Sequence, residues 1–302
     1  MSQTDSTVAP VSTSNPMALN ERWEEIVTDE RNRWTDSDGD EEFWAEHVDT
    51  YEERFVNKPA GSSRIRSLVG PSDTVLEIGP GTGRYTRLLA QRADVVTALE
   101  ASSSMANRLD RNLTAANCRK HVEIIEREWP STDIATHDWV VAGWSLYRQP
   151  DLHECLDRIL ETATQGFVII DSPGCLPPHR RVAVRAGDTL ASPPPRQAFY
   201  CGLLADRGCY PSVETVPKTR ERRADSKATL LETVLGDAVE DPLAHADALD
   251  TWLHEEPDAT DGTWCYRYTL PAAVISYVDG APNQPPGEGE NGTQAAPAEV
   301  DR

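Results

Sequence analysis

The sequence predicts an α/β fold in which helices cover both faces of a doubly wound, mostly parallel sheet. Two observations support this prediction. From Pro71 onward, short β-rich runs alternate with helical patterns, and parallel strands need such helical crossovers. The first β-rich run also leads into a glycine-rich turn at residues 79–83, which opens a helix. We further expect an N-terminal helical lid and a helical insertion late in the chain.

Five short runs rich in β-branched residues are the expected parallel strands. They occupy residues 74–78, 95–99, 122–125, 139–142 and 167–170. A helix is expected at 84–92, and the next one runs to about Ala116 after residues 102–104, whose hydroxyls can accept hydrogen bonds from the amides of a first turn. The apolar stripe within 151–163 predicts a third helix.

The pattern is weaker after residue 172. The expected elements there are a helix at 197–207 and strands at 212–216, 264–268 and 273–278. Residues 224–256 have the pattern of an inserted helical segment, and residues 175–195, rich in Pro and Arg, indicate a long surface loop or a broken helix.

The two ends of the chain have few residues to bury. Residues 1–17 are rich in Ser, Thr and Pro, and residues 280–302 are rich in Pro, Gly and Glu, so we expect two disordered tails, the second of them acidic. The ordered domain would then span 18–279. Near its start, Trp44, Val48, Tyr51 and Phe55 recur with helical spacing. This face either packs on the domain edge or forms a lid over a ligand.

Charge and composition exclude several classes of protein. There are 50 acidic and 29 basic residues, for a net charge of −21, which disfavours a general nucleic-acid coat protein. Only four lysines occur. An acidic, lysine-poor surface suits molar salt, where screening acts over roughly 3 Å, so a halophilic source is one hypothesis, and an acidic protein from a GC-rich genome is the alternative.

No targeting or metal-binding pattern is evident. No apolar run approaches the ~20 residues of a membrane helix. Residues 1–17 lack the basic start and apolar centre of a secretory signal, so a cytoplasmic protein without a membrane partner is expected. The six cysteines have no metal-ligand spacing, and we interpret them as reduced core thiols with no metal site.

The glycine turn is the most informative motif. It reads Glu-Ile-Gly-Pro-Gly-Thr-Gly over residues 77–83, between a strand and a helix, where bare backbone lets a ligand approach closely. A dinucleotide fingerprint needs its third glycine three residues after the second, and Arg84 stands there. An acid beside the pocket, Glu77, would repel a pyrophosphate but suit the cation of an amino acid.

With these residues the sequence resembles the class I S-adenosylmethionine-dependent methyltransferases over roughly residues 70–172. The resemblance rests on Glu77, Gly79, Gly81, Gly83 and, at the end of the second strand, Glu100. It implies an enzyme with a Rossmann-like sheet and S-adenosyl-L-methionine as cofactor. The three glycines would line the methionine part, Glu77 would lie near its amino group, and Glu100 would accept hydrogen bonds from the ribose hydroxyls.

The resemblance also assigns further residues to the cofactor. Residues 70–172 would be the cofactor-binding core, between N-terminal helices at 18–60 and a substrate-binding insertion at 175–260. The remaining expected cofactor contacts are Ala101, Ser102, Met105, Glu126 or Glu128, Trp129, Gly143 and Trp144. Of the two acids we favour Glu128, beside Trp129, as the partner of the adenine amino group. The Trp144 face could attract a sulfonium cation.

The acceptor is less well defined. The Asn/Asp-Pro-Pro-Tyr/Phe element of many amino-group methylases is absent, since the fourth strand ends in Gly-Trp-Ser-Leu at 143–146. The sequence therefore looks more like the small-molecule branch, of methyltransferase type 11 kind, and we expect a small-molecule acceptor and no nucleic acid. An RNA methylase and a non-catalytic S-adenosylmethionine sensor are the alternatives.

Two basic clusters adjoin the expected site. They are His179, Arg180, Arg181 and Arg185, and Lys218, Arg220, Arg222, Arg223 and Lys227. Either these clusters bind an anionic substrate or they pair with surface acids. If the acceptor is a hydroxyl, a base must take its proton, and the sequence does not single one out. The candidates are Tyr147, His153, Asp171 and His179.

Overall fold

The computed structural model describes the chain between Pro16 and Gly280, except for short internal stretches. The described residues are 16–34, 40–53, 59–187, 190, 193–236, 239, 241–249, 253–255 and 262–280. Most of the two predicted tails, 1–15 and 281–302, lies outside them. Pro16 and Met17, assigned above to the first tail, are the start of the first helix.

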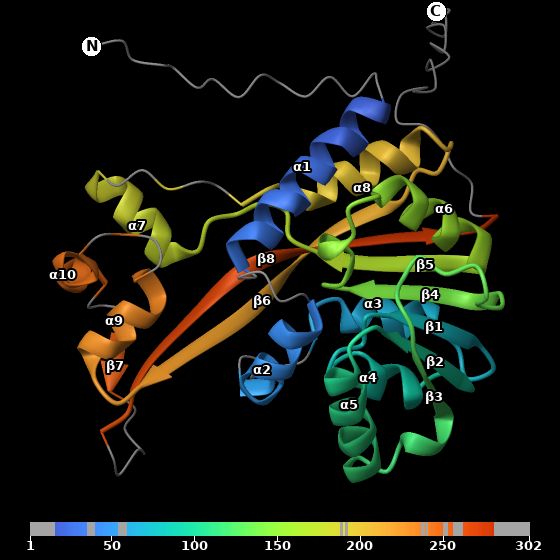
Figure 1. The fold of residues 1–302 in the computed structure, drawn as a ribbon, viewed down its shortest axis with the longest axis horizontal. Helices are drawn as coiled ribbons and strands as arrows, with labels where there is room; N and C mark the ends of the chain where they lie inside the picture. Colours follow the sequence, from blue (N-terminus) through green and yellow to red (C-terminus); the bar gives the residue numbers. More distant parts are fainter. Residues whose placement is uncertain are drawn as a thin grey trace, which may run out of the picture.

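One eight-stranded sheet organises the molecule (Figure 1). Its strands are β1 (Thr74–Ile78), β2 (Val95–Glu100), β3 (Val122–Glu126), β4 (His137–Gly143), β5 (Ala163–Asp171), β6 (Ser212–Ala224), β7 (Leu253–Glu255) and β8 (Trp264–Val278). The order is β3-β2-β1-β4-β5-β8-β6, with β7 paired to β8. Strands β1 to β5 are parallel, and β8 is antiparallel to its neighbours. The predicted doubly wound, Rossmann-like fold is confirmed.

Helices cover both faces of the sheet because its strands bury side chains in both directions. They are α1 (Pro16–Trp34), α2 (Asp40–Glu53), α3 (Ser62–Leu68), α4 (Thr86–Ala90), α5 (Ser103–Ala115), α6 (Leu152–Thr162), α7 (Pro178–Ala186), α8 (Arg196–Ala205), α9 (Lys227–Leu235) and α10 (Ala246–Leu249). Leu76 packs in one core with residues of α1, α6 and α8, whereas Val75 packs in the other with residues of α3, α4 and α5. None of the described helices is long and apolar enough to cross a membrane.

Helix α1 completes one of these cores. Trp23 is fully buried, and its ring lies 5.6 Å from that of Phe199 and 5.4 Å from that of Tyr200 in α8. The Trp23 indole also donates a hydrogen bond of 2.7 Å to the Gln149 carbonyl. Helix α1 is therefore part of the core, whereas α2 lies over the carboxyl edge of the sheet, where it packs against α5.

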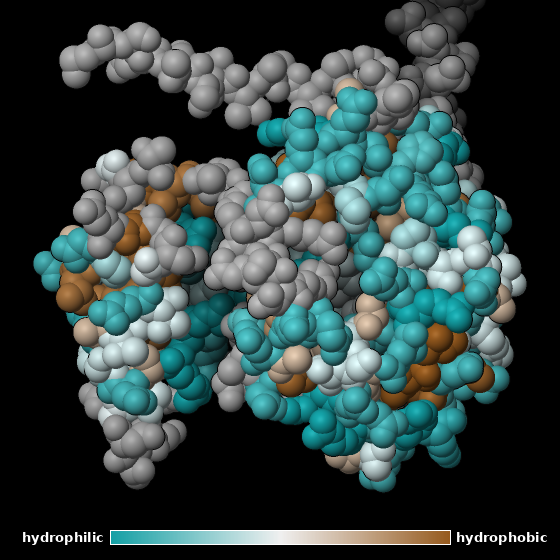
Figure 2. Space-filling view, in the orientation of Figure 1, coloured by the Kyte–Doolittle hydropathy of each residue, from teal (hydrophilic) through white to brown (hydrophobic). Residues whose placement is uncertain are grey.

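A second, smaller unit projects from the sheet (Figure 1). We call it the distal lobe: α7, α9, α10, β7 and the outer parts of β6 and β8 (residues 218–224 and 264–270). Its core contains Leu231, Leu235, Tyr266 and Tyr268. Figure 2 shows the lobe set off from the rest of the molecule by a hollow with a hydrophilic visible wall.

Several predicted elements differ from the observed ones. Residues 84 and 85 belong to the turn, so α4 is shorter than the predicted 84–92. The strand predicted at 212–216 continues to Ala224 as β6, and the two late runs are one strand, β8. Pro217 and Pro271 lie inside these strands, where they are paired with each other beyond the last residue of β8 that pairs with β5. A missing amide is tolerated there.

The insertion is also more structured than predicted. Helix α7 lies within the stretch 175–195, which was expected to be a loop or a broken helix. The segment 224–256 contains α9 and α10 as expected, but it ends in strand β7, which pairs with β8. Four of the six cysteines are buried as predicted, whereas Cys201 is partly exposed and Cys175 is exposed.

Candidate functional site

The glycine turn follows β1, and its backbone angles are ones that residues with side chains rarely adopt. Its glycines have φ angles of 63° (Gly79), 57° (Gly81) and 98° (Gly83). A Cβ on Gly79 would lie 2.5 Å from the Ser145 Cβ, and one on Gly83 would lie 2.7 Å from a Leu109 methyl carbon. At these two positions only glycine fits, because both the backbone angle and the neighbouring atoms exclude a side chain.

Glu100, at the end of β2, fixes this turn. The Gly81 amide donates a hydrogen bond of 2.8 Å to its Oε2, and the Ser102 amide donates one of 3.1 Å to its Oε1. The side chain is 7% exposed; its burial raises the pKa of the carboxyl, and these backbone amides oppose the shift. Each carboxylate oxygen keeps a lone pair for a further donor.

These residues surround a pocket of about 190 Å³, here called the turn pocket. Nine of the twelve predicted cofactor residues line it: Gly79, Gly81, Glu100, Ala101, Ser102, Met105, Glu128, Trp129 and Trp144. The structure also distinguishes the two candidate acids. Glu126 accepts a hydrogen bond of 2.7 Å from the Ser103 hydroxyl, whereas Glu128 faces the pocket.

Three predicted contact residues lie behind the lining. Gly83 is covered by Leu109, and the ring of Tyr85 fills the space beside Gly143, 2.4 Å from where a Cβ would stand. Glu77 is 2% exposed, and its Oε2 has no hydrogen-bond partner among the described residues. Burial raises the pKa of Glu77 to about 8, and the negative charge of Glu100 contributes to the shift.

The residues of the turn pocket fit an adenosyl group that carries an amino-acid tail. Met105, Trp129, Ile78 and Leu99 offer apolar walls for a flat ring system. The Glu100 carboxylate can accept hydrogen bonds from a pair of hydroxyls, and the glycine turn exposes backbone to the tail. The Glu100 carboxylate at this edge disfavours a diphosphate, whereas Glu77, to which the sequence pattern gave that role, does not line the pocket.

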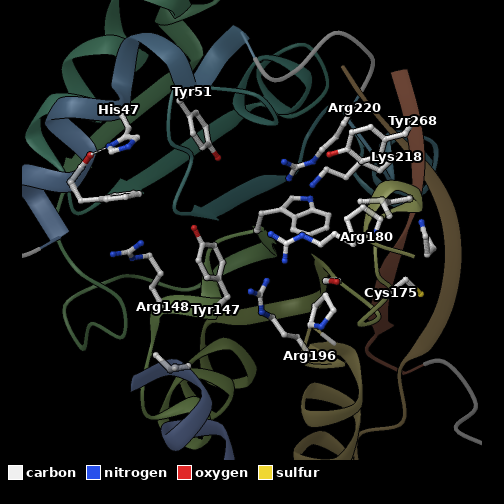
Figure 3. A pocket seen from close by; sticks show the side chains of 18 of the residues that line it. His47, Tyr51, Tyr147, Arg148, Cys175, Arg180, Arg196, Lys218, Arg220 and Tyr268 are labelled. Atoms are coloured by element: carbon white, nitrogen blue, oxygen red, sulfur yellow. Dashed lines mark hydrogen bonds between the residues drawn. The ribbon is translucent and has the colours of Figure 1, made fainter. Parts of the chain in front are cut away.

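A second cavity, of about 390 Å³, adjoins the first (Figure 3). We call it the cationic cavity, because five basic side chains line it and no described Asp or Glu does. These side chains are Arg148, Arg180, Arg196, Lys218 and Arg220. Its aromatic residues are Phe43, Trp44, His47, Tyr51, Trp144, Tyr147 and Tyr268. The cavity therefore combines ring faces with positive charge.

The two cavities share one wall. Trp44, Tyr51, Trp144, Tyr147 and Arg148 line both of them. Trp144 has a φ angle of 60°, which is unusual for a bulky residue, and its amide donates a hydrogen bond of 2.9 Å to the Ile170 carbonyl. Such strain is found where a side chain is held in place for function. A group in one cavity can thus reach a group in the other beside Trp144.

Several cations lie over aromatic rings. The Arg148 guanidinium is 5.0 Å from the ring centre of Phe43 and 5.2 Å from that of Trp44. Arg196 lies 4.7 Å from the ring centre of Tyr147, and the Lys218 ammonium lies 3.1 Å from that of Trp144. The contacts of the two arginines are attractive and help to fix the rings that form the wall.

The aromatic face of helix α2 lines the cavities, the position that the lid interpretation requires. The amide and hydroxyl of Ser104 both donate to Glu41, at 3.2 and 3.1 Å, and Arg108 pairs with Asp49. These contacts fasten α2 to α5, so that Trp44 and Tyr51 line both cavities. Phe55, the last residue of the predicted face, lies outside the described residues.

The predicted proton acceptors have different surroundings. His153 pairs with Asp157 on the surface of α6, and the His179 ring lies 3.2 Å from the Tyr266 hydroxyl inside the distal lobe. Asp171 is buried, where it pairs with Arg196 at 3.0 Å and accepts a hydrogen bond of 2.6 Å from Tyr200. Only Tyr147 of the four candidates lines the cavities, and burial raises the pKa of its hydroxyl.

Sequence reasoning missed part of the cationic cavity. Arg148, Arg196 and Phe43 were not singled out, and of the two basic clusters only Arg180, Lys218 and Arg220 line the cavity. The neighbours Arg223 and Arg267 pair instead with Glu221 on the other side of the ribbon. An alternation of basic residues at 218, 220 and 222 was the available signal, since alternate strand residues share a face.

Comparison with known proteins identifies relatives of the part that contains the turn pocket. Residues 51–141 match the family model for ribosomal RNA adenine dimethylase. The chain is 37% identical over 90 residues to a mitochondrial ribosomal RNA small subunit methyltransferase of Arabidopsis thaliana, covering 30% of this chain and 23% of that protein. It is 36% identical over 78 residues to a probable dimethyladenosine transferase of Dictyostelium discoideum, covering 26% and 25%.

The chain thus spans about a quarter of the length of these curated relatives. Among solved structures, a SAM-dependent methyltransferase from Thiobacillus denitrificans, in complex with S-adenosyl-L-homocysteine, is similar over 76% of this chain and 96% of its own. The sequence identity is 13% and the TM-score is 0.45.

The names of the family model and of the curated relatives agree with the expected class of enzyme, a methyltransferase, but they contradict the expected partner. We predicted a small-molecule acceptor and no nucleic acid, whereas the family model and the relatives are named for ribosomal RNA or for dimethyladenosine. The likeness to the small-molecule branch is therefore not supported. The inference failed because it relied on the absence of one motif and on the net charge, neither of which describes the cavity itself.

Proposed function

We propose that this protein transfers the methyl group of S-adenosylmethionine to RNA. The observation that carries the proposal is the shared wall of two cavities with different chemistry at the carboxyl edge of the sheet. One has a glycine turn and a carboxylate suited to an adenosyl donor. The other has aromatic rings and cations suited to a nucleotide. Ligands bind at this edge in doubly wound sheets, outside the carboxyl ends of the strands.

The donor would occupy the turn pocket. When bound, the cofactor supplies a methyl group that its sulfonium already activates. Glu100 would accept hydrogen bonds from the ribose hydroxyls, and Met105 and Trp129 would pack against the adenine. Glu128 would face the adenine amino group. The ring of Trp144 would stand at the junction of the cavities, where an aromatic face attracts a cation.

The acceptor nucleotide would occupy the cationic cavity. Single-stranded nucleotides are held by stacking on aromatic side chains and by arginine and lysine at the phosphates, and both kinds of group line this cavity. Phe43, Trp44 and Tyr268 offer rings for stacking. The chain carries a net charge of −21, so its affinity for RNA must come from this local cluster of cations rather than from the protein as a whole.

Catalysis would depend mainly on positioning. Orienting two reactants about 3–3.5 Å apart supplies much of the acceleration for a displacement with an activated donor. Tyr51, Trp144 and Tyr147 would exclude water from the junction and align the acceptor. Burial holds the Tyr147 hydroxyl in its protonated form, so it would donate a hydrogen bond to the acceptor rather than remove its proton.

The direct test is transfer of a labelled methyl group. The protein is incubated with S-adenosylmethionine labelled in the methyl carbon and with ribosomal RNA fragments, and the RNA is digested to nucleosides. We expect label in a nucleoside, and none with Gly79→Ala, which obstructs the turn pocket. Release of S-adenosylhomocysteine without label in the RNA would contradict the proposal.

A further inference from the structure

Two basic side chains of the cationic cavity, one buried and one partly buried, have no carboxylate partner among the described residues. Lys218 is 4% exposed, and no described side chain pairs with it; its ammonium lies on the ring of Trp144. The Nε of Arg220 is buried and has no hydrogen-bond partner among the described residues. Burying an unpaired charge is costly, so two such groups on adjacent positions of one strand face need an explanation.

The surroundings of Lys218 add to this cost. Burial lowers the pKa of Lys218 well below its usual value, and the charges of Arg220, Arg84 and Arg196 lower it further. The Asp171 carboxylate opposes this shift, and it is already bound to Arg196 and Tyr200. Burial also lowers the pKa of Arg220. An anion placed among these groups would relieve the repulsion and satisfy their donors.

The geometry brings the donors to one place. Lys218 and Arg220 alternate on β6, opposite Leu270 and Tyr268 of β8, so both side chains leave the ribbon on the same face. Arg196 enters from the first turn of α8. In Figure 3 the nitrogen-bearing ends of Lys218, Arg220 and Arg196 point toward the middle of the cavity from these two elements.

We propose that Lys218 and Arg220, together with Arg196, bind a phosphate group of the acceptor inside the cationic cavity, next to Trp144. Only the source of the phosphate, RNA, rests on the proposed function. Three donor groups from two elements suit a tetrahedral oxyanion, which accepts several charge-assisted hydrogen bonds at once. The phosphate is either a terminal one or one that bridges two nucleotides, and both would place a nucleotide against the aromatic wall.

The first experiment uses inorganic phosphate as the probe and does not involve methyl transfer. Binding is measured by calorimetry for the wild-type protein and for Lys218→Met and Arg220→Met, which keep the bulk of the side chain without its charge. We expect each variant to bind phosphate at least about tenfold more weakly, the loss of one charge-assisted contact. Lys218→Arg should retain most of the binding.

The matched control is Arg223→Gln. Arg223 is on the same strand but pairs with Glu221 on the other side, and it does not line the cavity. This variant should bind phosphate as the wild type does. Thermal unfolding of each variant shows that it is folded. Absence of phosphate binding by the wild type, or equal binding by all variants, would overturn the proposal.

Proton uptake gives a readout that a merely structural role would not change. Because a bound anion would raise the pKa of Lys218, phosphate binding should take up more protons in the wild type than in Lys218→Met, seen as heats that differ between buffers of different ionisation enthalpy. Equal proton exchange by the two proteins would contradict the role of Lys218.

The second experiment separates the sources of the phosphate. Short RNA oligonucleotides with a 5′-phosphate or a 5′-hydroxyl are titrated with the same variants. Tighter binding of the 5′-phosphate form, lost in Lys218→Met, would indicate a terminal phosphate. Equal binding of both forms, weakened in Lys218→Met and Arg220→Met, would indicate a bridging one. RNA binding independent of both residues would refute the assignment to the acceptor, even if methyl transfer to RNA were observed.

Discussion

The turn pocket and the cationic cavity share Trp144 as a wall but are built in different ways. Residues at the carboxyl ends of β1 and β2 and in the segments that follow β1 to β4 form most of the turn pocket, and a carboxylate fixed by backbone amides marks its edge. The cationic cavity draws side chains from α2, α8, β6, β8 and the segment after β4. The first is a feature of local backbone, and the second is a feature of tertiary assembly.

Each region also contains a buried ionisable group. Glu77 lies behind the turn pocket, and Lys218 lies in the cationic cavity. Burial shifts both groups toward their neutral forms, because a low-dielectric environment penalises charge. In the proposed function, the turn pocket takes a cationic donor and the cationic cavity takes an anionic acceptor. The predictions below test this difference.

The largest effect on ligand binding is expected from Gly79→Ala. The new Cβ would overlap the Ser145 side chain at 2.5 Å and would sit at a φ of 63°. We expect affinity for S-adenosylhomocysteine, measured by calorimetry, to fall by more than about 100-fold. The control is Gly208→Ala, at a φ of 70° with no atom within 4 Å of the new Cβ, which carries the backbone strain alone. Wild-type affinity in Gly79→Ala would show that the turn is placed incorrectly.

Glu77→Gln should stabilise the protein at alkaline pH. The unfolded chain loses the Glu77 proton near pH 4.5, whereas the folded protein keeps it to about pH 8. The folded state therefore binds more protons in this window, and stability falls as the pH rises from about 4.5 to 8. At ~1.36 kcal/mol per unit, Glu77→Gln should gain up to about 5 kcal/mol above pH 8 and little near pH 4.

The measurement is denaturant unfolding of both proteins from pH 4 to pH 9. A stability difference that stays constant with pH would mean that Glu77 ionises normally in the folded protein. Glu154→Gln, on the exposed surface of α6, is the matched control and should show no such trend.

Lys218→Met should change the free energy of unfolding less than Glu77→Gln does. Its stabilising effect should be lost, rather than gained, as the pH rises. Unfolded lysine binds its proton below about pH 10.5, and the folded protein binds it less well. The stability of the wild type is therefore reduced below that pH and recovers as the pH approaches it. We expect Lys218→Met to raise the unfolding free energy by about 1–2 kcal/mol at pH 7 and to lose this advantage near pH 10.5. Destabilisation at pH 7 would indicate an ion pair in the free protein.

Salt should affect the surface and the cationic cavity in opposite directions. The net charge is −21, and the excess acidic side chains repel one another over about 10 Å at 0.1 M salt but over only about 3 Å at 1 M. We expect the melting temperature to rise by several degrees in 1 M potassium chloride, while affinity for RNA falls. An unchanged melting temperature would remove the argument for adaptation to salt.

The same contrast explains what the sequence could predict. The parallel strands β1 to β5 are short apolar runs between helices, and the turn pocket follows them directly, so both could be inferred from neighbouring residues. Local spacing also indicated Glu100, which lies 21 residues after Gly79. The residues behind the lining could not be distinguished in this way: Gly143 has its place because the ring of Tyr85 lies against it.

The outer part of the molecule required tertiary information. In β6, residues 218–223 read Lys-Thr-Arg-Glu-Arg-Arg, which has no apolar alternation, and the strand exists because it pairs with β8 along its whole length. Arg148 and Arg196 are 48 positions apart and converge only through packing. The acceptor class was predicted wrongly for the same reason, since net charge averages over the surface and does not reveal a cluster of five cations.

The most direct test asks whether one substitution in each cavity weakens a different ligand. Binding of S-adenosylhomocysteine and of an RNA oligonucleotide is measured for wild type, Glu100→Ala and Arg220→Met. Glu100→Ala should weaken the first ligand by roughly 1.5–3 kcal/mol and leave the second unchanged, and Arg220→Met should do the reverse. If both substitutions weaken the same ligand, or neither weakens any, the two cavities do not hold donor and acceptor separately, and the account is wrong.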